Sequence, residues 1–511
     1  MTDSALHPVS TARAGRRTST GIPGLDEVLD GGFPAHRFYL IQGNPGVGKT
    51  TLALQFLLAG AKANERCLYI TLSETKEELL GVASSHGWDI SPLDILDLSL
   101  IESHLSDENQ TTMFHPSEVE LNQTTAAILS HVRTLVPSRV VFDSMSEMRL
   151  LAESSLRFRR QMLALKQYFI GIEATVLFLD DNTSGESDRN MQSLVHGVIS
   201  LEQLAPEYGS ERRRLRVIKI RGSTYRGGFH DYLILTGGMQ VFPRLVAAAH
   251  HRNFPDTVLS SGLPALDTLL EGGMDRGTSN LIIGPAGTGK STMATFFALA
   301  AAKRGQRSVI YGFDENVKTW RKRCESMGLD LPSYVDSGMI RYQQIDPAEL
   351  SPGNFAHMIH ADVEQDEVQL VILDSLNGYL NAMSGDRHLA LQLHEMLTYL
   401  SQQGVVTIMT LAQHGLIGHM EAPVDITYIA DTVVVLRYFE AFGEVKRAVS
   451  VIKKRSGAHE RMIREYQMSN TGITIGEPLA DFHGVLSGTP IFRGPPEAMI
   501  TKHPVHDARA S

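Results

Sequence analysis

The sequence GNPGVGKTT occupies residues 43–51, between the apolar run FYLIQ and the helix-like stretch LALQFLLAGAKA. The pattern Gly-x-x-x-x-Gly-Lys-Ser/Thr binds phosphate because its glycines let backbone N–H groups approach the phosphate oxygens without obstruction by a side chain. A second copy, GPAGTGKST, occupies residues 284–292 in the same strand-loop-helix context. One match can arise by chance in a glycine-rich turn, whereas two matches in one chain indicate two nucleotide-binding loops.

The whole chain is organised as a repeat of this unit. Gly43 and Gly284 lie 241 positions apart, and STGIPGLDEVLDGG (residues 19–32) matches SSGLPALDTLLEGG (residues 260–273) at the same offset. Self-similarity over a domain-sized period indicates duplication of a domain rather than a short-repeat solenoid. The length of 511 residues agrees with this interpretation, because one hydrophobic core rarely organises so long a chain.

Alternation of apolar strands with amphipathic helices indicates the fold class of both halves. FYLIQ, CLYIT, RVVFD and ATVLFL have the pattern of buried strands in the first half, as do NLIIG, SVIYGF, LVILD and VVTIMT in the second. Helices such as residues 51–63 lie between them, and antiparallel-looking segments such as RLRVIKIRG and YLILTGGMQVF end each half. We therefore predict α/β domains with mostly parallel sheets, whose ligands bind at the carboxyl ends of the strands.

These patterns divide the chain into five predicted parts. They are a basic tail without a fixed fold at residues 1–17, a first domain at 18–247, a linker at 248–257, a second domain at 258–487, and a Pro-, Gly- and His-rich tail at 488–511.

The composition narrows the classes of function. No window approaches the roughly 18 apolar residues of a membrane span, and the first residues lack the apolar core of a secretory signal. Cys67 and Cys324 have no paired spacing, which favours a reducing cytoplasm over a disulfide or zinc framework. The net charge of -10 disfavours a surface devoted to nucleic acid, although basic runs occur at residues 212–216 and 453–455. Such runs are ordinarily solvated strand faces.

Each loop supplies the groups that hold a magnesium nucleotide. Lys49 and Lys290 would reach the outer phosphates, and an aspartate ends a buried strand in each half, where it would orient metal-bound water. An aspartate in that position can instead cap the next helix. The predicted metal ligands are Thr50, Asp143, Ser291 and Asp374. The predicted ATP-binding residues are Gly43, Asn44, Pro45, Gly46, Val47, Gly48, Lys49, Thr50, Thr51, Gly284, Pro285, Ala286, Gly287, Thr288, Gly289, Lys290, Ser291 and Thr292.

Hydrolysis also needs a carboxylate that activates water beside the terminal phosphate. ITLSET places Glu74 just past the strand that follows the first loop helix, and YGFDEN places Asp314 and Glu315 at the same point of the second half. We predict these three residues as catalytic groups. A solvated acidic turn is the alternative explanation.

The segment TGIPGLDEVLDGGFPAHRFYLIQGNPGVGKTT, the tandem repetition and the K-x-R sequence that ends each half resemble the KaiC family of circadian-clock ATPases from about residue 18 to about residue 490. The resemblance implies two RecA-like P-loop domains per subunit and a two-tiered hexamer with nucleotide at the subunit boundaries. It also implies that cations of one subunit contact the neighbour's nucleotide in trans, where a positive charge can stabilise the transferred phosphoryl group. These cations are Lys219, Arg221, Lys453 and Arg455.

Two departures from the family's pattern concern its acidic and phosphorylated residues. Where the family has paired glutamates, this chain has Ser73 and Glu74 in the first half and Asp314 and Glu315 in the second. The family's Ser-Thr phosphorylation pair falls on Thr427 and Tyr428, so Thr427 is the predicted phosphorylation site.

The predicted function is that of an ATP-hydrolysing and autophosphorylating serine/threonine kinase, which forms a hexameric timing or signalling platform with ATP and Mg²⁺. The resemblance implies a KaiB-like or other signalling protein as partner, and we expect no membrane or nucleic-acid partner. One alternative is a DNA-stimulated motor or recombinase, since RecA-like domains also build such proteins. A nucleotide-dependent scaffold with little turnover is the other, which the missing first-half acid favours.

Overall fold

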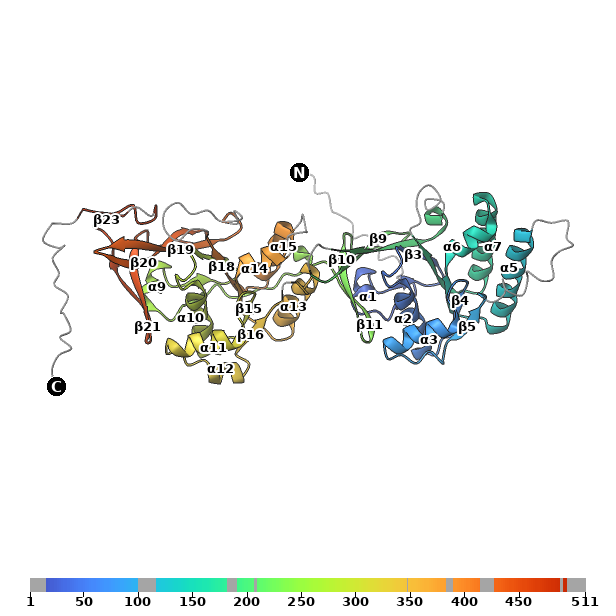
Figure 1. Cartoon of the computed structure of the whole chain (residues 1–511), viewed down its shortest axis with the longest axis horizontal. Helices are drawn as coiled ribbons and strands as arrows, with labels where there is room; N and C mark the ends of the chain where they lie inside the picture. The colour runs from blue at the N-terminus through green and yellow to red at the C-terminus, as the bar shows by residue number, and fades with distance from the viewer. Residues whose placement is uncertain are drawn as a thin grey trace, which may run out of the picture. The chain divides into compact units, whose positions relative to one another are not determined.

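The computed structural model describes residues 15–99, 116–181, 191–205, 209–346, 348–382, 389–413, 427–487 and 490–493. The chain is divided between Arg244 and Leu245 into two compact units, which we call the first and the second unit (Figure 1). Within the described ranges, no helix combines the length and the apolar character that a membrane crossing requires.

The described residues of the first unit form a nine-stranded sheet in the order β11-β10-β9-β8-β3-β7-β6-β4-β5. The strands from β5 to β8 in this order are parallel, and β9, β10 and β11 continue the sheet antiparallel. The strands are β3 (Phe38–Gly43), β4 (Cys67–Thr71), β5 (Asp94–Asp97), β6 (Arg139–Asp143), β7 (Thr175–Asp181), β8 (Gly197–Leu204), β9 (Arg212–Ile220), β10 (His230–Leu235) and β11 (Gly238–Phe242).

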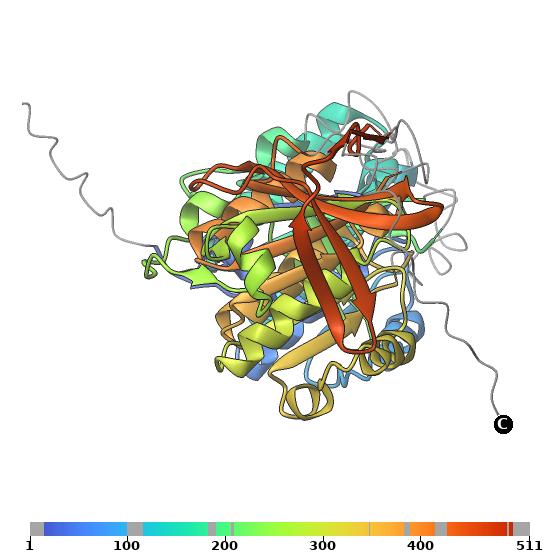
Figure 2. The same cartoon turned by 90° about the vertical axis from the view of Figure 1, so that its left-hand side faces the viewer.

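The second unit repeats this topology strand for strand, in the order β22-β21-β20-β19-β14-β18-β17-β15-β16. Figure 2 shows its β21–β22 hairpin, in red, at the edge of the sheet. The strands are β14 (Ser279–Gly284), β15 (Ser308–Gly312), β16 (Ile340–Gln344), β17 (Leu370–Asp374), β18 (Val406–Ala412), β19 (Thr432–Ala441), β20 (Glu444–Lys454), β21 (Arg464–Ser469) and β22 (Gly472–Pro478).

Both faces of the first sheet are buried under helices. Tyr39 and Ile41 of β3 belong to one hydrophobic core, whereas Phe38 and Leu40 belong to another, as the two-residue period of a strand requires. Burying one such large side chain contributes roughly 1.5–3 kcal/mol, so the continuous apolar strands are a main source of stability. The first core is covered by α1 (Leu25–Val28), α2 (Lys49–Lys62) and α3 (Lys76–Ser85), and the second by α5 (Pro116–Leu135), α6 (Met145–Ala152) and α7 (Ser155–Gly171).

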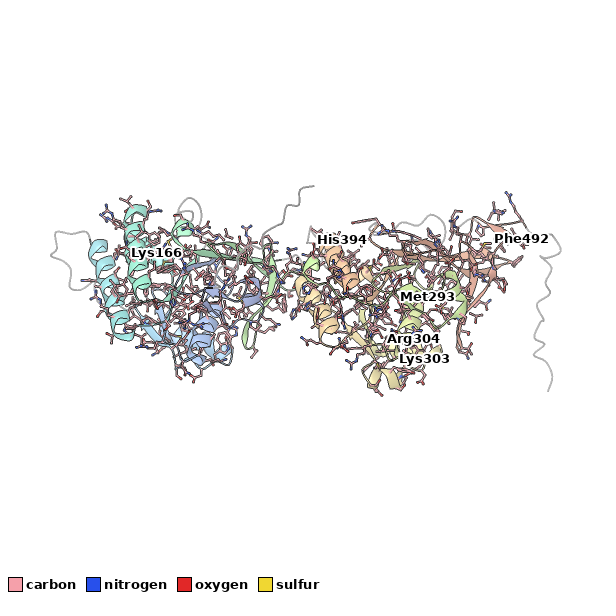
Figure 3. The ribbon with its side chains drawn as sticks, turned by 180° about the vertical axis from the view of Figure 1, so that it is seen from behind. Lys166, Met293, Lys303, Arg304, His394 and Phe492 are labelled. Atoms are coloured by element: carbon pink, nitrogen blue, oxygen red, sulfur yellow. The ribbon has the colours of Figure 1, made fainter. Side chains whose placement is uncertain are left out.

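The second sheet is covered in the same way. Leu281 and Ile283 of β14 face one core and Ile282 faces the other. Met293 of α10, labelled in Figure 3, is fully buried in the second of these cores. One face packs against η1 (Ala247–Ala249), α13 (Pro352–Glu364), α14 (Leu376–Ala382) and α15 (Leu389–Gln402), and the other against α9 (Pro264–Leu269), α10 (Lys290–Lys303), α11 (Val317–Ser326) and α12 (Pro332–Asp336).

The repeated S-[ST]-G-x-P-x-L-D motif stabilises the turn before α1 and before α9. Asp26 accepts hydrogen bonds from Ser19 Oγ at 2.6 Å and from the backbone N–H of Thr20 at 2.8 Å. Asp267 accepts the equivalent bonds from Ser260 at 2.6 Å and from Ser261 at 2.7 Å. This part of the repeat is therefore structural, because its aspartates satisfy backbone N–H groups of the turn that leads into each helix.

Three short two-stranded sheets complete the described chain. In the last of them, the ring of Phe492 (Figure 3) lies 5.2 Å from that of Phe482. Arg17 of the predicted N-terminal tail pairs with Pro34, whereas residues 1–14, 488–489 and 494–511 of the predicted tails lie outside the described residues. The strands are β1 (Arg17–Thr18) with β2 (Phe33–Pro34), β12 (Val258–Leu259) with β13 (Met274–Asp275), and β23 (Phe482–His483) with β24 (Ile491–Phe492).

The predicted fold class is confirmed: each unit is a RecA-like α/β domain with a mostly parallel sheet between two helical layers. The eight strands predicted from apolar runs are β3, β4, β6 and β7 in the first unit and β14, β15, β17 and β18 in the second. The segments predicted to end each half are the antiparallel strands β9 to β11, β20 and β21.

Candidate functional site

The two glycine-rich loops connect the central strand of each sheet to its first long helix. Residues 43–51 run from the last residue of β3 into the first turn of α2, and residues 284–292 run in the same way from β14 into α10. Gly48 and Gly289 precede the helices with φ values of 95° and 92°. A Cβ atom there would lie 2.4 Å from Ile234 Cδ1 in the first unit and 2.4 Å from Met468 Sδ in the second. Only glycine fits this left-handed turn, which exposes the first N–H groups of each helix to an anion.

The loop lysines differ between the two units. Lys49 Nζ donates to the carbonyl oxygens of Gly43 at 2.8 Å and Asn44 at 3.1 Å, and it forms an ion pair with Asp181 at 2.7 Å. Lys290 Nζ donates to Pro285 O at 2.8 Å, and no carboxylate of the described residues lies within ion-pair distance of it. Burial lowers the pKa of Lys290 to about 8.

The registers of the two sheets explain this difference. Asp181 ends β7 opposite Gly43, whereas Ala412 ends β18 opposite Gly284. The first site therefore contains an acid that the second lacks. Asp181 was not among the predicted site residues, although the two aspartates in LFLDD at the end of a buried strand were a usable signal.

Each unit brings its predicted metal-binding hydroxyl and aspartate together. Ser291 Oγ donates to Asp374 Oδ1 at 2.8 Å, and Thr410 donates to the same oxygen at 2.6 Å. Asp143 accepts from the Tyr69 hydroxyl at 2.5 Å, and the nearby Thr50 hydroxyl acts to lower the pKa of Asp143. Burial raises the pKa of both aspartates. Paired hydroxyl and carboxylate oxygens fit Mg²⁺, whose charge would favour the ionised form of each buried aspartate.

Glu74 has the properties of a general base. Its backbone is fixed by Thr71, whose hydroxyl donates to Glu74 O at 2.5 Å and accepts from Glu74 N at 3.1 Å. Its buried Oε2 atom has no hydrogen-bond partner among the described residues. Burial, with the nearby carboxylate of Asp143, raises the pKa of Glu74 to about 7. A carboxylate with a pKa near neutrality suits proton abstraction at physiological pH.

The acids of the second unit have different partners. Arg323 of α11 forms a bidentate pair with Glu315, at 2.7 and 3.2 Å, and donates to Thr292 Oγ1 at 2.9 Å. Asp314 accepts a hydrogen bond from Ser375 Oγ. Arg323 was not among the predicted site residues, and the equivalent position of the first unit, 241 residues earlier, is occupied by Val82. The charge of Glu315 is thus compensated by Arg323. Asp314, which has a neutral hydroxyl as its partner, is therefore the better candidate for the base of this site.

The four predicted in-trans cations donate hydrogen bonds to backbone carbonyl oxygens of their own unit. Lys219 Nζ donates to Gln192 O, and Arg221 donates to Ser193 O at 2.9 Å. In the second unit Lys453 donates to Thr427 O at 2.9 Å, and Arg455 donates to Tyr428 O at 2.8 Å and pairs with Asp431 at 3.5 Å.

The strand register places these cations at the opposite end of each sheet from the loop. Lys219 lies opposite Val198, which lies beside Leu40, three residues before the loop at Gly43. Lys453 is placed similarly, opposite Val433, which lies beside Leu281. Three residues of strand span about 10 Å, so the structure does not bring these cations to the loop of their own unit.

Lys219 and Arg221 lie close enough to Lys166 of α7 for the three positive charges to repel one another. Figure 3 labels Lys166 on α7. Burial, Arg221 and Lys166 together lower the pKa of Lys219. Burial and the same cations lower the pKa of His196 to about 4. Mutual repulsion of this kind is relieved by an anion, so the cluster is suited to bind one.

Thr427 lies in the turn that precedes β19, on the side of the second unit that carries Lys453 and Arg455. Tyr428 beside it is 60% exposed. Like the cations, Thr427 lies at the amino end of the central strands and away from the loop at residues 284–292.

Two RecA-like domains, each with a glycine-rich phosphate loop, a strand-end aspartate and a nearby acidic residue, define a tandem P-loop ATPase. A sequence model of the KaiC ATPase family matches residues 18–246 and 259–480, and the chain belongs to this family.

Curated relatives extend over nearly the whole chain. A circadian clock oscillator protein KaiC from Acaryochloris marina is 26% identical over 477 residues, which cover 92% of this chain and 90% of the relative. The circadian clock protein KaiC2 of Synechocystis sp. is 27% identical over 486 residues, covering 92% and 83%. The circadian clock protein KaiC3 of the same organism is 26% identical over 483 residues, covering 93% and 95%.

Proposed function

We propose that this chain binds Mg-ATP at both loops, hydrolyses it, and assembles head to tail into a hexameric ring that serves as a timing or signalling platform. The observation that carries the proposal is the placement of Lys219 and Lys453 at the end of each sheet opposite the loop. A surface that carries the loop and a second surface that carries the cations form a heterologous contact when two subunits meet, and such contacts generate rings.

The residues of the first site divide the chemistry between them. The N–H groups of the loop and Lys49 hold the phosphates, while Thr50 and Asp143 hold the metal ion, which neutralises developing charge when bound. Glu74 takes the proton of the attacking water, and Arg221 of the next subunit stabilises the phosphoryl group. The partner of the ring is proposed to be a KaiB-like or other signalling protein, and its location the cytoplasm.

Mixing two defective variants tests whether the site is shared between subunits. We expect Glu74→Gln and Arg221→Ala, each in a Lys290→Ala background, to have little turnover alone. When the monomers are mixed equally before ATP is added, about a quarter of the interfaces combine an intact Glu74 with an intact Arg221, and turnover should recover to about that fraction. ATPase assays of the mixture measure this.

The matched control mixes Glu74→Gln with Asp143→Asn. Both changes lie on the loop side of the interface, so every interface keeps one defect and no recovery is expected. If the mixture of Glu74→Gln with Arg221→Ala shows only the mean of its two components, the site is complete within one subunit and the in-trans proposal is wrong.

The second site is proposed to transfer phosphate to Thr427 of the neighbouring subunit as well as to water. Thr427 and the in-trans cations lie on one side of the unit, which would face the neighbour's loop in a head-to-tail ring. Asp314 would take the hydroxyl proton, since Glu315 is paired with Arg323. The side chain of Asp314 is shorter than glutamate by one methylene, and a misplacement of about 1 Å can slow a step on the order of 100-fold.

We therefore expect slow phosphorylation of Thr427 alone. After long incubation with Mg-ATP, peptide mass spectrometry should find one phosphate on Thr427 and none on Tyr428. Asp314→Asn and Lys290→Ala should abolish the modification, whereas Tyr428→Phe should leave it unchanged. A Thr427 peptide that stays unmodified, or that is phosphorylated equally in Lys290→Ala, would remove the kinase assignment.

A second candidate function is supported by the pairing of Arg323 with Glu315 and Thr292. Arg323 forms an ion pair with an acidic group beside the loop. Because the paired Glu315 is then less able to act as a base, this arrangement favours nucleotide binding over turnover. The second unit would then act as a nucleotide-dependent scaffold, and the phosphorylation experiment distinguishes the two functions.

A further inference from the structure

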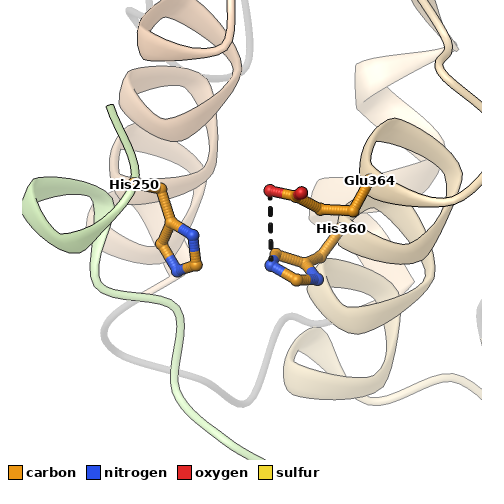
Figure 4. A group of neighbouring side chains, drawn as sticks. All are labelled: His250, His360 and Glu364. Atoms are coloured by element: carbon orange, nitrogen blue, oxygen red, sulfur yellow. Dashed lines mark ion pairs between the residues drawn. The ribbon is translucent and has the colours of Figure 1, made fainter. Parts of the chain in front are cut away.

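Two histidines and a glutamate converge in the second unit, away from its phosphate loop. His250 directly follows η1, and His360 and Glu364 lie four residues apart on α13, so that their side chains share one face of the helix (Figure 4). One ligand atom from each of the three residues can be chosen so that all three lie within 4.8 Å of one another. His360 Nε2 lies 4.0 Å from Glu364 Oε1.

The surrounding residues hold this cluster in position. The segment with His250 packs on α15, where the backbone N–H of Arg252 donates to Gln402 O at 3.2 Å. The fully buried ring of Tyr399 lies 5.2 Å from the ring of His250 and stacks on that of His360 at 5.3 Å. The Tyr399 hydroxyl donates to Glu364 Oε1 at 3.4 Å. A buried tyrosine that orients a carboxylate in this way is typical of the residues that support metal ligands.

The chemistry of the three side chains selects one class of ion. Two imidazole nitrogens and one carboxylate suit zinc and related transition metals, whereas Mg²⁺ and Ca²⁺ prefer ligand sets made of oxygen. Zinc–ligand bonds of about 2.0–2.2 Å require the ligand atoms to approach one another more closely than they do here, so binding requires rotation of these side chains. Three protein ligands leave one position for water.

We propose that His250, His360 and Glu364 bind one divalent transition-metal ion of the zinc class. The ion joins the segment that begins the second unit to α13, and so stabilises the attachment of residues 245–252 to the helical layer of that unit. This role is separate from the nucleotide sites, whose predicted metal ligands are oxygen atoms.

Calorimetric titration of the full chain with Zn²⁺, in excess Mg²⁺ to occupy the carboxylate sites, tests the proposal. The chain has 20 histidines, so weak background binding of Zn²⁺ is expected. The site is therefore identified by comparing the Zn²⁺ affinity of the wild type with that of variants of the three residues. His250→Ala, His360→Ala and Glu364→Gln should each weaken the tightest binding event by more than about 100-fold, since even residues that only support metal ligands change affinity 10–100-fold. Titration with Co²⁺ should give the intense visible absorption of a site with nitrogen ligands and low coordination number.

His251→Ala and His394→Ala are the matched controls. His251 is exposed and adjacent to His250, and His394 is exposed on α15 (Figure 3). Neither should change the affinity for Zn²⁺. Circular dichroism without metal verifies the fold of each variant, and the exposed Glu364 keeps the test decisive if a histidine variant unfolds. If wild type binds Zn²⁺ no more tightly than Glu364→Gln, the cluster is only an aromatic packing contact and the proposal is wrong.

Discussion

ATP turnover by the first unit is expected to fall by about 100-fold or more when Glu74 is replaced by glutamine, which is the typical effect of losing a general base. Glutamine keeps the shape of the side chain but cannot accept the proton of the attacking water. The measurement is steady-state ATPase activity in a Lys290→Ala background, where the second site is silent. Nucleotide binding, measured by calorimetry in the same variant, should be preserved.

The pH profile provides an independent signature of Glu74. Its pKa is raised to about 7, and only the ionised carboxylate acts as a base. Turnover should therefore be constant well above pH 7 and should fall as the pH drops through 7, by about tenfold per unit below it. This acidic limb should be absent from the residual activity of Glu74→Gln.

Ser73→Ala is the control for Glu74. Ser73 is the exposed neighbour at the other position of the acidic pair, and it cannot accept a proton at neutral pH, so its replacement should leave turnover unchanged. Equal turnover in Glu74→Gln and in its Lys290→Ala parent would exclude Glu74 from the mechanism.

ATP-driven assembly should depend more on Lys49 than on Lys290. Lys49→Ala would leave Asp181 without its 2.7 Å ion pair, in a site that also contains Glu74 and Asp143. Three carboxylates near the phosphates repel ATP. Lys290→Ala leaves fewer carboxylate charges beside its loop, because β18 ends in Ala412 and Glu315 retains Arg323. We expect the ATP concentration required for hexamer formation to be about tenfold or more higher for Lys49→Ala than for Lys290→Ala. A repulsion of about 1.4 kcal/mol corresponds to a factor of ten in affinity.

Light scattering coupled to size-exclusion chromatography across an ATP series measures this difference. Asp181→Asn in the Lys49→Ala background should partly restore assembly, because it removes one of the three carboxylate charges of the site. Equal ATP requirements of Lys49→Ala and Lys290→Ala, or monomers of wild type at saturating ATP, would contradict the prediction.

The fold and the nucleotide loops were predictable from local patterns. The strands β3 and β14 are continuous apolar runs buried on both faces, and the glycines at positions 48 and 289 occupy a left-handed turn that other residues rarely adopt. The strand-end aspartates Asp143 and Asp374 followed from the same logic, because parallel strands end at one edge of the sheet. Such features depend on residues close together in the chain, so the order of amino acids is sufficient to predict them.

Partners between distant segments were not predictable, because they depend on register and packing. Asp181 reaches Lys49 only because β7 lies beside β3 with Asp181 opposite Gly43, and Arg323 reaches Glu315 only because α11 packs with Arg323 beside Glu315 and Thr292. The raised pKa of Glu74 follows from burial and from Asp143 on another strand. His250 and His360 are 110 positions apart, and only the packing of η1 on α15 brings them together. Periodicity determines which residues are buried, whereas the charge and distance relations between elements arise only when the sheet and its helices are assembled.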